Sequence, residues 1–246
     1  FKLNIKKNKM KKILIFFGAG ISAESGICTF RDAVGLSENH EVMEVASIEG
    51  WHSNPELVLN FYNMRRADLN NVKPNKAHLL CAELQTDFNV HVITQNVDDL
   101  HERAGSKNIL HLHGSLLKAK SVLNDRVIFD WSGDMTLSDK ADDGGQIRPA
   151  IVWFGEDVPL LGAAMDLIKE CDILIIVGTS LQVYPAASLV GFAHRAEKIF
   201  LIDVAIVESY ETRRLGENLT IVEKPATEGM KEVYDILMRD NGIKDF

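Results

Sequence analysis

The sequence predicts an α/β protein built on a doubly wound parallel sheet, with a second, smaller module that is helical and irregular. Three observations indicate this fold class. Short apolar runs rich in β-branched residues recur without polar alternation, which is typical of strands buried on both faces of a parallel sheet. Helical patterns separate several of these runs, and a glycine-rich turn follows the first. The chain has 246 residues, 46% of them hydrophobic and 25% charged, which suffices for one large core or two small ones.

The expected elements alternate along the chain. Six apolar runs are predicted to be strands: 13–17, 90–94, 109–112, 151–154, 173–177 and 199–202. Helices are predicted at 77–84, 161–170 and 186–196, and a closing helix at 228–239 with Thr227 as its cap. Strand, turn, helix and strand in this order are typical of the right-handed crossovers of a Rossmann-like sheet.

Two segments interrupt this alternation and are expected to form the smaller module. Residues 35–75 have a helical pattern with Pro55 at a first-turn position, and residues 115–148 are polar and irregular. Residues 1–9 are interpreted as an extension, because Met10 has the character of a natural start. A ligand cleft is expected between the two parts, outside the carboxyl ends of the strands. The Rossmann-like domain then comprises residues 10–34, 76–114 and 149–246.

Charge and cysteine content exclude several classes of protein. The net charge is −8, and because the first twelve residues hold six lysines and no acid, 21 basic residues face 35 acidic ones in the rest. This balance argues against nucleic acid as the main partner and is compatible with a basic protein segment as substrate. No apolar run approaches the roughly 18 to 20 residues that span a bilayer, so we expect a cytoplasmic protein without a membrane partner. Three distant cysteines predict neither a disulfide framework nor a thiolate zinc site.

The glycine-rich turn after the first expected strand has the form G-x-G-x-x-A. It opens a helical stretch and contains Gly18, Ala19, Gly20, Ser22 and Ala23. In such a fingerprint the glycines permit a tight turn and let backbone N–H groups approach a pyrophosphate. A nicotinamide dehydrogenase would have a second strand ending in Asp or Glu about 20 residues further on, and residues 28–45 contain no strand-like run. The pattern indicates dinucleotide binding, and by itself it also fits a glycine turn that holds no ligand.

Five sequence blocks, taken together, resemble the signature of the sirtuins, the NAD-dependent protein deacylases. In order they are GAGISAESGI with the following Phe30 and Arg31, TQNVDDLH, HLHG, RP with VWFGE, and GTS with VYP. The resemblance covers about residues 12–226 apart from the middle insertion, and the ICTFR variant at 27–31 is similar to the bacterial CobB-like branch of the class III type. It implies an enzyme that uses NAD to remove acyl groups from protein lysine side chains, with release of nicotinamide and O-acyl-ADP-ribose.

The resemblance also implies a role for residues at the carboxyl ends of the strands. His113 matches the catalytic histidine, which would act as a base during acyl transfer to the ribose. Asn96 is expected to orient the nicotinamide ribose, and Val97 with Asp98 to hold the carboxamide. Outside this context such residues could simply end a strand, and His111 is expected to serve packing. The remaining implied cofactor-binding residues are Gly18, Ala19, Gly20, Ser22, Ala23, Phe30, Arg31, Gln95, Gly178, Thr179, Ser180, Asp203 and Ala226.

The expected substrate-binding residues lie in two places. Tyr62 and Arg65 are three apart, hence on one helix face, and match the Tyr-x-x-Arg pair of sirtuins that prefer succinyl- and malonyl-lysine. The alternative for this pair is a surface arginine beside a packed tyrosine. The second group is Val152, Phe154 and Gly155. The resemblance therefore predicts a desuccinylase and demalonylase that also deacetylates acylated-lysine proteins.

One departure from the family and two rival activities complete the expectations. Most sirtuins bind a structural zinc through two cysteine pairs after the catalytic histidine, and this chain has no cysteine between Cys81 and Cys171. We therefore expect NAD as cofactor and neither zinc nor another metal, with packing around Phe129 and Trp131 in its place. Rival activities are NAD hydrolysis and ADP-ribosyl transfer. A non-catalytic NAD-binding regulatory module is a further alternative, which the retained His113 disfavours.

Overall fold

A six-stranded parallel sheet forms the centre of the computed structural model, which describes residues 10–27 and 42–242. Each neighbouring pair of strands runs parallel. From β1 the chain adds β2 and β3 on one side of the sheet, and later β7, β8 and β9 on the other side. The direction of strand order therefore reverses between β1 and β7. Doubly wound sheets bind ligands at such a switch point. The strand order is β3 (Ile109–His111), β2 (Asn89–Thr94), β1 (Lys12–Phe17), β7 (Ile173–Val177), β8 (Lys198–Asp203) and β9 (Leu219–Glu223).

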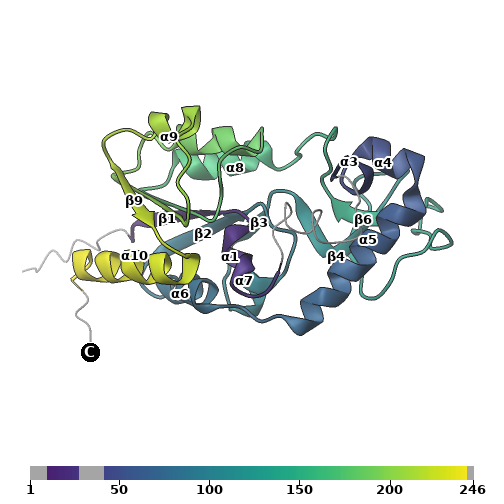
Figure 1. Cartoon of the computed structure of the whole chain (residues 1–246), viewed down its shortest axis with the longest axis horizontal. Helices are drawn as coiled ribbons and strands as arrows, with labels where there is room; N and C mark the ends of the chain where they lie inside the picture. Colours follow the sequence, from purple (N-terminus) through teal and green to yellow (C-terminus); the bar gives the residue numbers. More distant parts are fainter. Residues whose placement is uncertain (1–9, 28–41, 243–246) are drawn as a thin grey trace, which may run out of the picture.

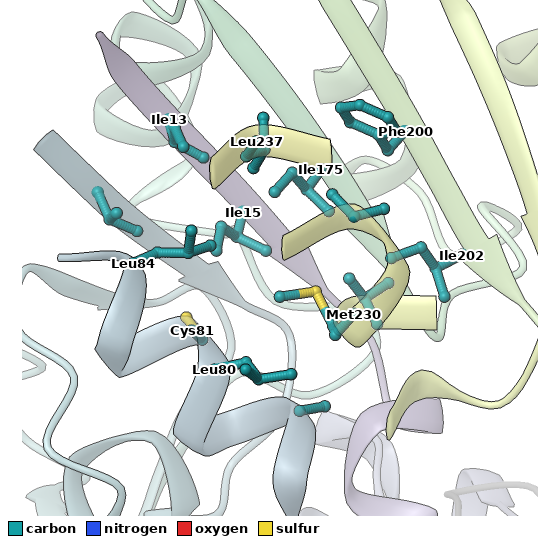
Figure 2. Close-up of a cluster of buried hydrophobic side chains, with 14 of the residues drawn as sticks. Ile13, Ile15, Leu80, Cys81, Leu84, Ile175, Phe200, Ile202, Met230 and Leu237 are labelled. Carbon is teal, nitrogen blue, oxygen red and sulfur yellow. The ribbon is translucent and has the colours of Figure 1, made fainter. Parts of the chain in front are cut away.

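Helices cover both faces of this sheet (Figure 1). Side chains alternate along a strand, so Ile13 and Ile15 of β1 point to one face and Leu14 to the other, all fully buried. On the first face α6 (Lys76–Leu84) and α10 (Ala226–Asp240) cover the strands with side chains such as Leu80, Leu84, Met230 and Leu237 (Figure 2). On the second face lie α8 (Leu161–Lys169), the 3₁₀ helix η2 (Ala186–Phe192) and α9 (Tyr210–Arg214).

The smaller module lies at the end of the molecule remote from α10 (Figure 1). Its helices are α3 (Val42–Val45), α4 (Ile48–Ser53), α5 (Pro55–Asp68) and η1 (Leu69–Asn71), and its antiparallel sheet has the order β5 (Ile128–Asp130), β4 (Gly114–Ser121) and β6 (Ile147–Ile151). The start of α5 follows from local sequence, because Pro55 occupies the first turn and the Asn54 side chain accepts a hydrogen bond from Leu57 N. Two short helices, α1 (Gly20–Ala23) and α7 (Leu100–Arg103), contact α10 and α6 respectively.

The predicted fold class is confirmed, and three details of the strands differ from the expectation. The run 151–154 is not a strand of the parallel sheet. The strand here is β6, antiparallel to β4, which shares only Ile151 with the predicted run, and its Arg148 and Pro149 interrupt the continuous apolar pattern that predicts a buried strand. The segment 115–148 is not irregular as predicted, because it contains most of β4, all of β5 and the start of β6. The edge strand β9 was missed because only Val222 in it is buried.

Helix ends differ as well. The predicted helix 186–196 is a 3₁₀ helix that ends at Phe192. Helix α10 begins at Ala226 behind Pro225, so Thr227 is inside the first turn and does not cap it. Instead Thr227 donates a hydrogen bond from its hydroxyl to Glu24 beside α1. No helix in the described part of the chain is long and apolar enough to cross a membrane. Phe30, Arg31 and the proposed extension 1–9 lie outside the described residues.

Candidate active site

Three glycines bring the turns after β1 and β7 into direct contact at the switch point. A Cβ on Gly18 would lie 2.6 Å from the carbonyl oxygen of Gly178, and a Cβ on Gly20 would lie 2.6 Å from Gly178 Cα. Gly178 has φ +62°, which glycine adopts without strain. Gly20 N donates to the Gly178 carbonyl at 2.9 Å. The turns therefore form one continuous backbone surface, with Ala19 just before α1 and Ala23 at the end of α1 beside it.

A buried hydroxyl joins this turn to the loop after β2. Ser22 Oγ donates to Asp98 Oδ2 at 2.9 Å and accepts from Asn96 Nδ2 at 3.1 Å. Asn96 Nδ2 also donates to the Gly18 carbonyl at 3.1 Å. Burial raises the pKa of Asp98, and hydrogen bonds from Leu100 N and Ser22 only partly oppose this shift. Sequence reasoning placed these residues in separate motifs, and they form one cluster.

Gln95 links the same loop to the turn after β7. Its Nε2 donates to Thr179 Oγ1 and to the Phe17 carbonyl, both at 3.3 Å. Ser180 and Asp203 line one shallow depression with Thr179, and Asp203 Oδ1 accepts from Ala205 N at 3.1 Å. Ala226 is buried at the start of α10, away from these contacts. The expected cofactor-binding residues on described segments thus lie along the carboxyl edge of the sheet.

His113 stands between β3 and β4, where the two sheets meet. Its Nδ1 is 3.1 Å from the Gln95 carbonyl oxygen. A carbonyl can only accept, so this contact places the imidazole proton on Nδ1 and leaves the Nε2 lone pair available. Burial lowers the pKa of His113 below its usual 6.5, although the bond to Gln95 opposes the shift. At neutral pH the residue is therefore an uncharged base.

His111 has the opposite electrostatic environment. Its Nε2 lies 2.6 Å from Glu102 Oε1, and its Nδ1 lies 3.3 Å from the Asn96 carbonyl oxygen. Burial lowers the pKa of His111, but the bond and charge of Glu102 outweigh it, so the net shift is upward. The sequence predicted only a packing role for His111. Its contact with the Asn96 carbonyl shows that it also supports the backbone of the Asn96 loop. No periodic pattern pointed to Glu102 as its partner.

Tyr62 joins helix α5 to the loop that follows β6. Tyr62 is buried, and its hydroxyl accepts a hydrogen bond from Trp153 Nε1 at 2.9 Å. Burial raises the pKa of Tyr62 despite this bond and the nearby positive charge of Arg65, so the hydroxyl keeps a proton to donate. Arg65 is half-buried on the same face of α5. The two residues are therefore neighbours, as their spacing predicted.

The loop after β6 is stabilised by an ion pair that the sequence did not reveal. Arg148 donates to both carboxylate oxygens of Glu156, at 2.8 and 2.7 Å, and its guanidinium lies 3.6 Å from the centre of the Trp153 ring. Burial raises the pKa of Glu156, but the bonds from Arg148 outweigh it and the net shift is downward. Val152 N donates to the His113 carbonyl at 3.0 Å. The only sequence signal was that Arg148, Trp153 and Glu156 belong to one motif.

The exposed rim of this loop carries the remaining expected substrate residues. Phe154 is 42% exposed although aromatic, and Gly155 has φ +87°. A β-carbon at Gly155 would be strained and would lie 2.9 Å from Ile48 Cγ2. The loop therefore carries an apolar rim at Phe154. The same loop is hydrogen-bonded to His113 by Val152 and to Tyr62 by Trp153. Within residues 10–27 and 42–242, no group of three or more His, Cys, Asp or Glu side chains is arranged to hold a metal ion.

Comparison with known proteins agrees with this geometry. The model of the Sir2 family matches residues 18–185. An NAD-dependent protein deacylase of Helicobacter pylori is 53% identical over 229 residues, covering 93% of this chain and 96% of the relative. One of Bacteroides thetaiotaomicron is 47% identical over 235 residues, covering 93% and 99%.

Solved structures give the same result. A crystal structure of a Sir2 homologue with NAD superposes with a TM-score of 0.82 at 36% identity, covering 95% of this chain and 91% of the other. A Sir2 protein bound to an acetylated peptide superposes with a TM-score of 0.74 at 30% identity, covering 96% of each chain. The likeness therefore spans both the parallel sheet and the smaller module.

Proposed function

The chain belongs to the Sir2 family, and from this premise we propose that it is an NAD-dependent protein-lysine deacylase. The observation that carries the proposal is His113, an uncharged imidazole whose Nδ1 is held on the Gln95 carbonyl beside the cluster of Ser22, Asn96 and Asp98. This places a base next to a buried polar cluster at the switch point of the sheet. The curated relatives in Helicobacter pylori and Bacteroides thetaiotaomicron support the same activity.

The residues at the switch point fit a dinucleotide. Gly18 and Gly20 leave no room for β-carbons, so the turns after β1 and β7 approach each other closely and leave a bare backbone surface against which a pyrophosphate would lie. Asn96, Asp98, Thr179, Ser180 and Asp203 would hold the two ribose units and the carboxamide. When bound, NAD supplies an electrophilic ribose carbon once nicotinamide leaves. A Sir2 homologue in complex with NAD supports this assignment.

His113 performs the proton transfer in this proposal. Because Nδ1 is occupied by the Gln95 carbonyl, Nε2 would take the proton of a ribose hydroxyl, whose oxygen would bond to the acyl carbon while the bond from that carbon to the lysine nitrogen breaks and the free lysine leaves. Burial keeps His113 uncharged at neutral pH, as a base must be. Val152 N donates to the His113 carbonyl and fixes its backbone next to the rim of Phe154 and Gly155, where the acyl-lysine would enter. A Sir2 protein bound to an acetylated peptide supports an acylated protein segment as substrate.

We propose further that succinyl- and malonyl-lysine are preferred acyl substrates. Such groups end in a carboxylate, whose desolvation in an apolar channel is costly. Arg65 can receive it with two parallel hydrogen bonds, and Tyr62 has a proton to donate because its hydroxyl already accepts from Trp153. Acetyl-lysine needs neither residue. The enzyme is therefore proposed to deacetylate as well, with less dependence on this pair.

The smaller module is proposed to fold without zinc. Part-buried hydrogen bonds hold its segment between β4 and β6, where Ser121 Oγ donates to Asp143 Oδ1 at 2.8 Å and Gly145 N donates to the same oxygen at 2.9 Å. Purified protein should contain no stoichiometric zinc, and chelators should leave both melting temperature and activity unchanged. One tightly held zinc per chain in metal analysis would refute this. Free, buried Cys81 and Cys171 favour a reducing compartment, and we propose the cytoplasm.

Nicotinamide release tests the proposed activity. A deacylase should release nicotinamide from NAD only when an acyl-lysine peptide is present, with one free lysine formed per nicotinamide. Equal release without peptide would indicate an NAD hydrolase. Release accompanied by addition of ADP-ribose to the peptide would indicate an ADP-ribosyltransferase, and NAD binding without release would indicate a regulatory module.

A further inference from the structure

Arg66 of helix α5 is a buried cation with an unusual set of partners. Its side chain is 4% exposed, and burial lowers its pKa although the charge of Asp134 opposes the shift. Its Nε donates to the Leu116 carbonyl at 2.8 Å, and its Nη1 donates to the Gly133 carbonyl at 3.1 Å and to Asn63 Oδ1 at 2.9 Å. These acceptors are neutral. A guanidinium buried at such cost is retained where its fixed geometry is needed.

The partner Leu116 lies where the pairing of β4 with β6 is interrupted. The register between these strands shifts between Ser115 and Ala119. The Leu116 carbonyl accepts from Arg66, and Leu116 N donates to the Val97 carbonyl at 2.8 Å. Two hydrogen bonds therefore connect α5, through one residue of β4, to the loop that contains Asn96 and Asp98.

A second contact fixes α5 to the same module. Asn63 Nδ2 donates to the Met135 carbonyl at 2.9 Å, and Asn63 Oδ1 accepts from Met135 N at 2.8 Å. Arg66 binds Gly133 two residues earlier in that segment. Because Tyr62 is one turn before Arg66 on α5, these contacts set the rotation of the helix face that carries Tyr62 and Arg65.

We propose that Arg66 is a positioning residue that fixes the acyl-recognition face of α5 relative to the cofactor loop at Val97. This inference rests on the proposed function of Tyr62 and Arg65. In this proposal Arg66 contacts neither NAD nor the acyl-lysine. Its hydrogen bond to Leu116 couples the acyl-recognition face of α5 to the cofactor loop at Val97. A purely structural arginine would stabilise the smaller module without this coupling.

Two measurements separate these roles. In Arg66→Met the apparent affinity for NAD should weaken by about 2- to 30-fold, the size of coupling carried by such networks. The second measurement is a double-mutant cycle with Arg65→Met, scored by kcat/KM for a succinyl peptide. The loss caused by Arg65→Met should be at least about 3-fold smaller in the Arg66→Met background, because Arg65 is then already misplaced.

Asp143→Ala is the matched control. It removes the hydrogen bonds of Ser121 and Gly145 in the same module, far along the chain from α5, so it should lower the melting temperature without changing NAD affinity. Arg66→Lys is the second variant if Arg66→Met does not fold. It retains the charge but lacks the fork that binds Leu116 and Gly133 together, and should weaken NAD binding in the same direction.

Calorimetric titration with NAD alone measures NAD affinity without any turnover of substrate. If the protein binds NAD but removes no acyl group, the proposed function fails while weaker NAD binding in Arg66→Met still supports the link to Val97. Unchanged NAD affinity in both Arg66 variants would overturn the inference. So would multiplicative effects of Arg65 and Arg66 on the succinyl peptide, because Arg66 would then only stabilise the fold.

Discussion

At the scale of single residues, the site depends on which atoms of a side chain already form hydrogen bonds within the protein. The Gln95 carbonyl occupies His113 Nδ1, and the Trp153 indole donates to the Tyr62 hydroxyl. Each contact leaves one defined group for chemistry: a lone pair on His113 Nε2 and a proton on Tyr62. His111, two residues from His113, has its pKa shifted in the opposite direction by Glu102. Neighbouring carbonyls and carboxylates thus assign different roles to chemically similar residues.

Arg65→Met tests acyl recognition at this scale. Hydrogen bonds to a charged group contribute roughly 1.5 to 3 kcal/mol, so desuccinylation should fall by about 10- to 150-fold in kcat/KM. Deacetylation should change far less, and Arg65→Lys should not restore the loss because an ammonium lacks the planar fork. Matched succinyl and acetyl peptides provide the measurement. A constant ratio between the two substrates would show that Tyr62 and Arg65 are structural.

The buried imidazoles of His78 and His101 govern stability at low pH. Their ring centres are 4.9 Å apart, and neither ring nitrogen of His101 has a hydrogen-bond partner in the described part of the chain. Burial lowers the pKa of both, that of His78 to about 4. Below about pH 6.5 the unfolded chain therefore binds protons that the folded protein does not, and the free energy of unfolding decreases as pH falls.

His101→Leu should reduce this pH dependence. Each such histidine contributes a slope of up to about 1.4 kcal/mol per pH unit below pH 6.5, and none above it. The stability difference between variant and wild type, measured by denaturant unfolding at pH 8 and pH 5, should therefore shift in favour of the variant at pH 5. The same difference at both pH values would mean that His101 is accommodated as a cation.

At the scale of elements, the turns after β1 and β7 depend on missing side chains. Gly18→Ala would put a Cβ 2.6 Å from the Gly178 carbonyl oxygen, so the turns must separate. We expect a loss of about 1 to 3 kcal/mol in stability and weaker NAD binding. Gly162→Ala is the control, because nothing lies within 4 Å of its Cβ in α8, and it should be neutral or stabilising by up to about 1 kcal/mol. Thermal melts and NAD titrations of both variants test the contrast, which equal effects would contradict.

The sequence predicted elements well where a local signal existed. Asn54 and Pro55 mark the start of α5, and continuous apolar runs mark β1 and β7. It failed for β6, because Arg148 and Pro149 interrupt its apolar character and the neighbouring run 151–154 has the strand-like pattern instead. It also missed β9, whose side chains are mostly exposed at the sheet edge.

The site follows the same rule. Residues within one motif, such as Ser22 or His113, were identifiable by position, whereas contacts between distant segments were not. Arg66 binds Leu116 across 50 residues, and Trp153 binds Tyr62 across 91. No periodicity along the chain encodes such pairs, because only folding brings them together. The roles of Arg66, Arg148 and Glu156 therefore came from the structure.

At the scale of the whole molecule, the parallel sheet and the smaller module each supply part of the site (Figure 1). The sheet contributes the glycine turns and the loop of Asn96, and the module contributes Tyr62, Arg65 and the rim at Phe154. His113 stands where the chain passes from one to the other, and its carbonyl accepts from Val152 on the far side. In the proposed function, acyl transfer to NAD-derived ribose would therefore require both parts in one arrangement.

Mass spectrometry of the reaction products tests this account most directly. Wild type and His113→Ala are incubated with NAD and an acyl-lysine peptide, and O-acyl-ADP-ribose is quantified against free ADP-ribose. With His113 as the base, O-acyl-ADP-ribose should be the main product of wild type and should fall by about 10²- to 10⁴-fold in His113→Ala while NAD still binds. Free ADP-ribose as the main product, or an undiminished yield of O-acyl-ADP-ribose from His113→Ala, would contradict it.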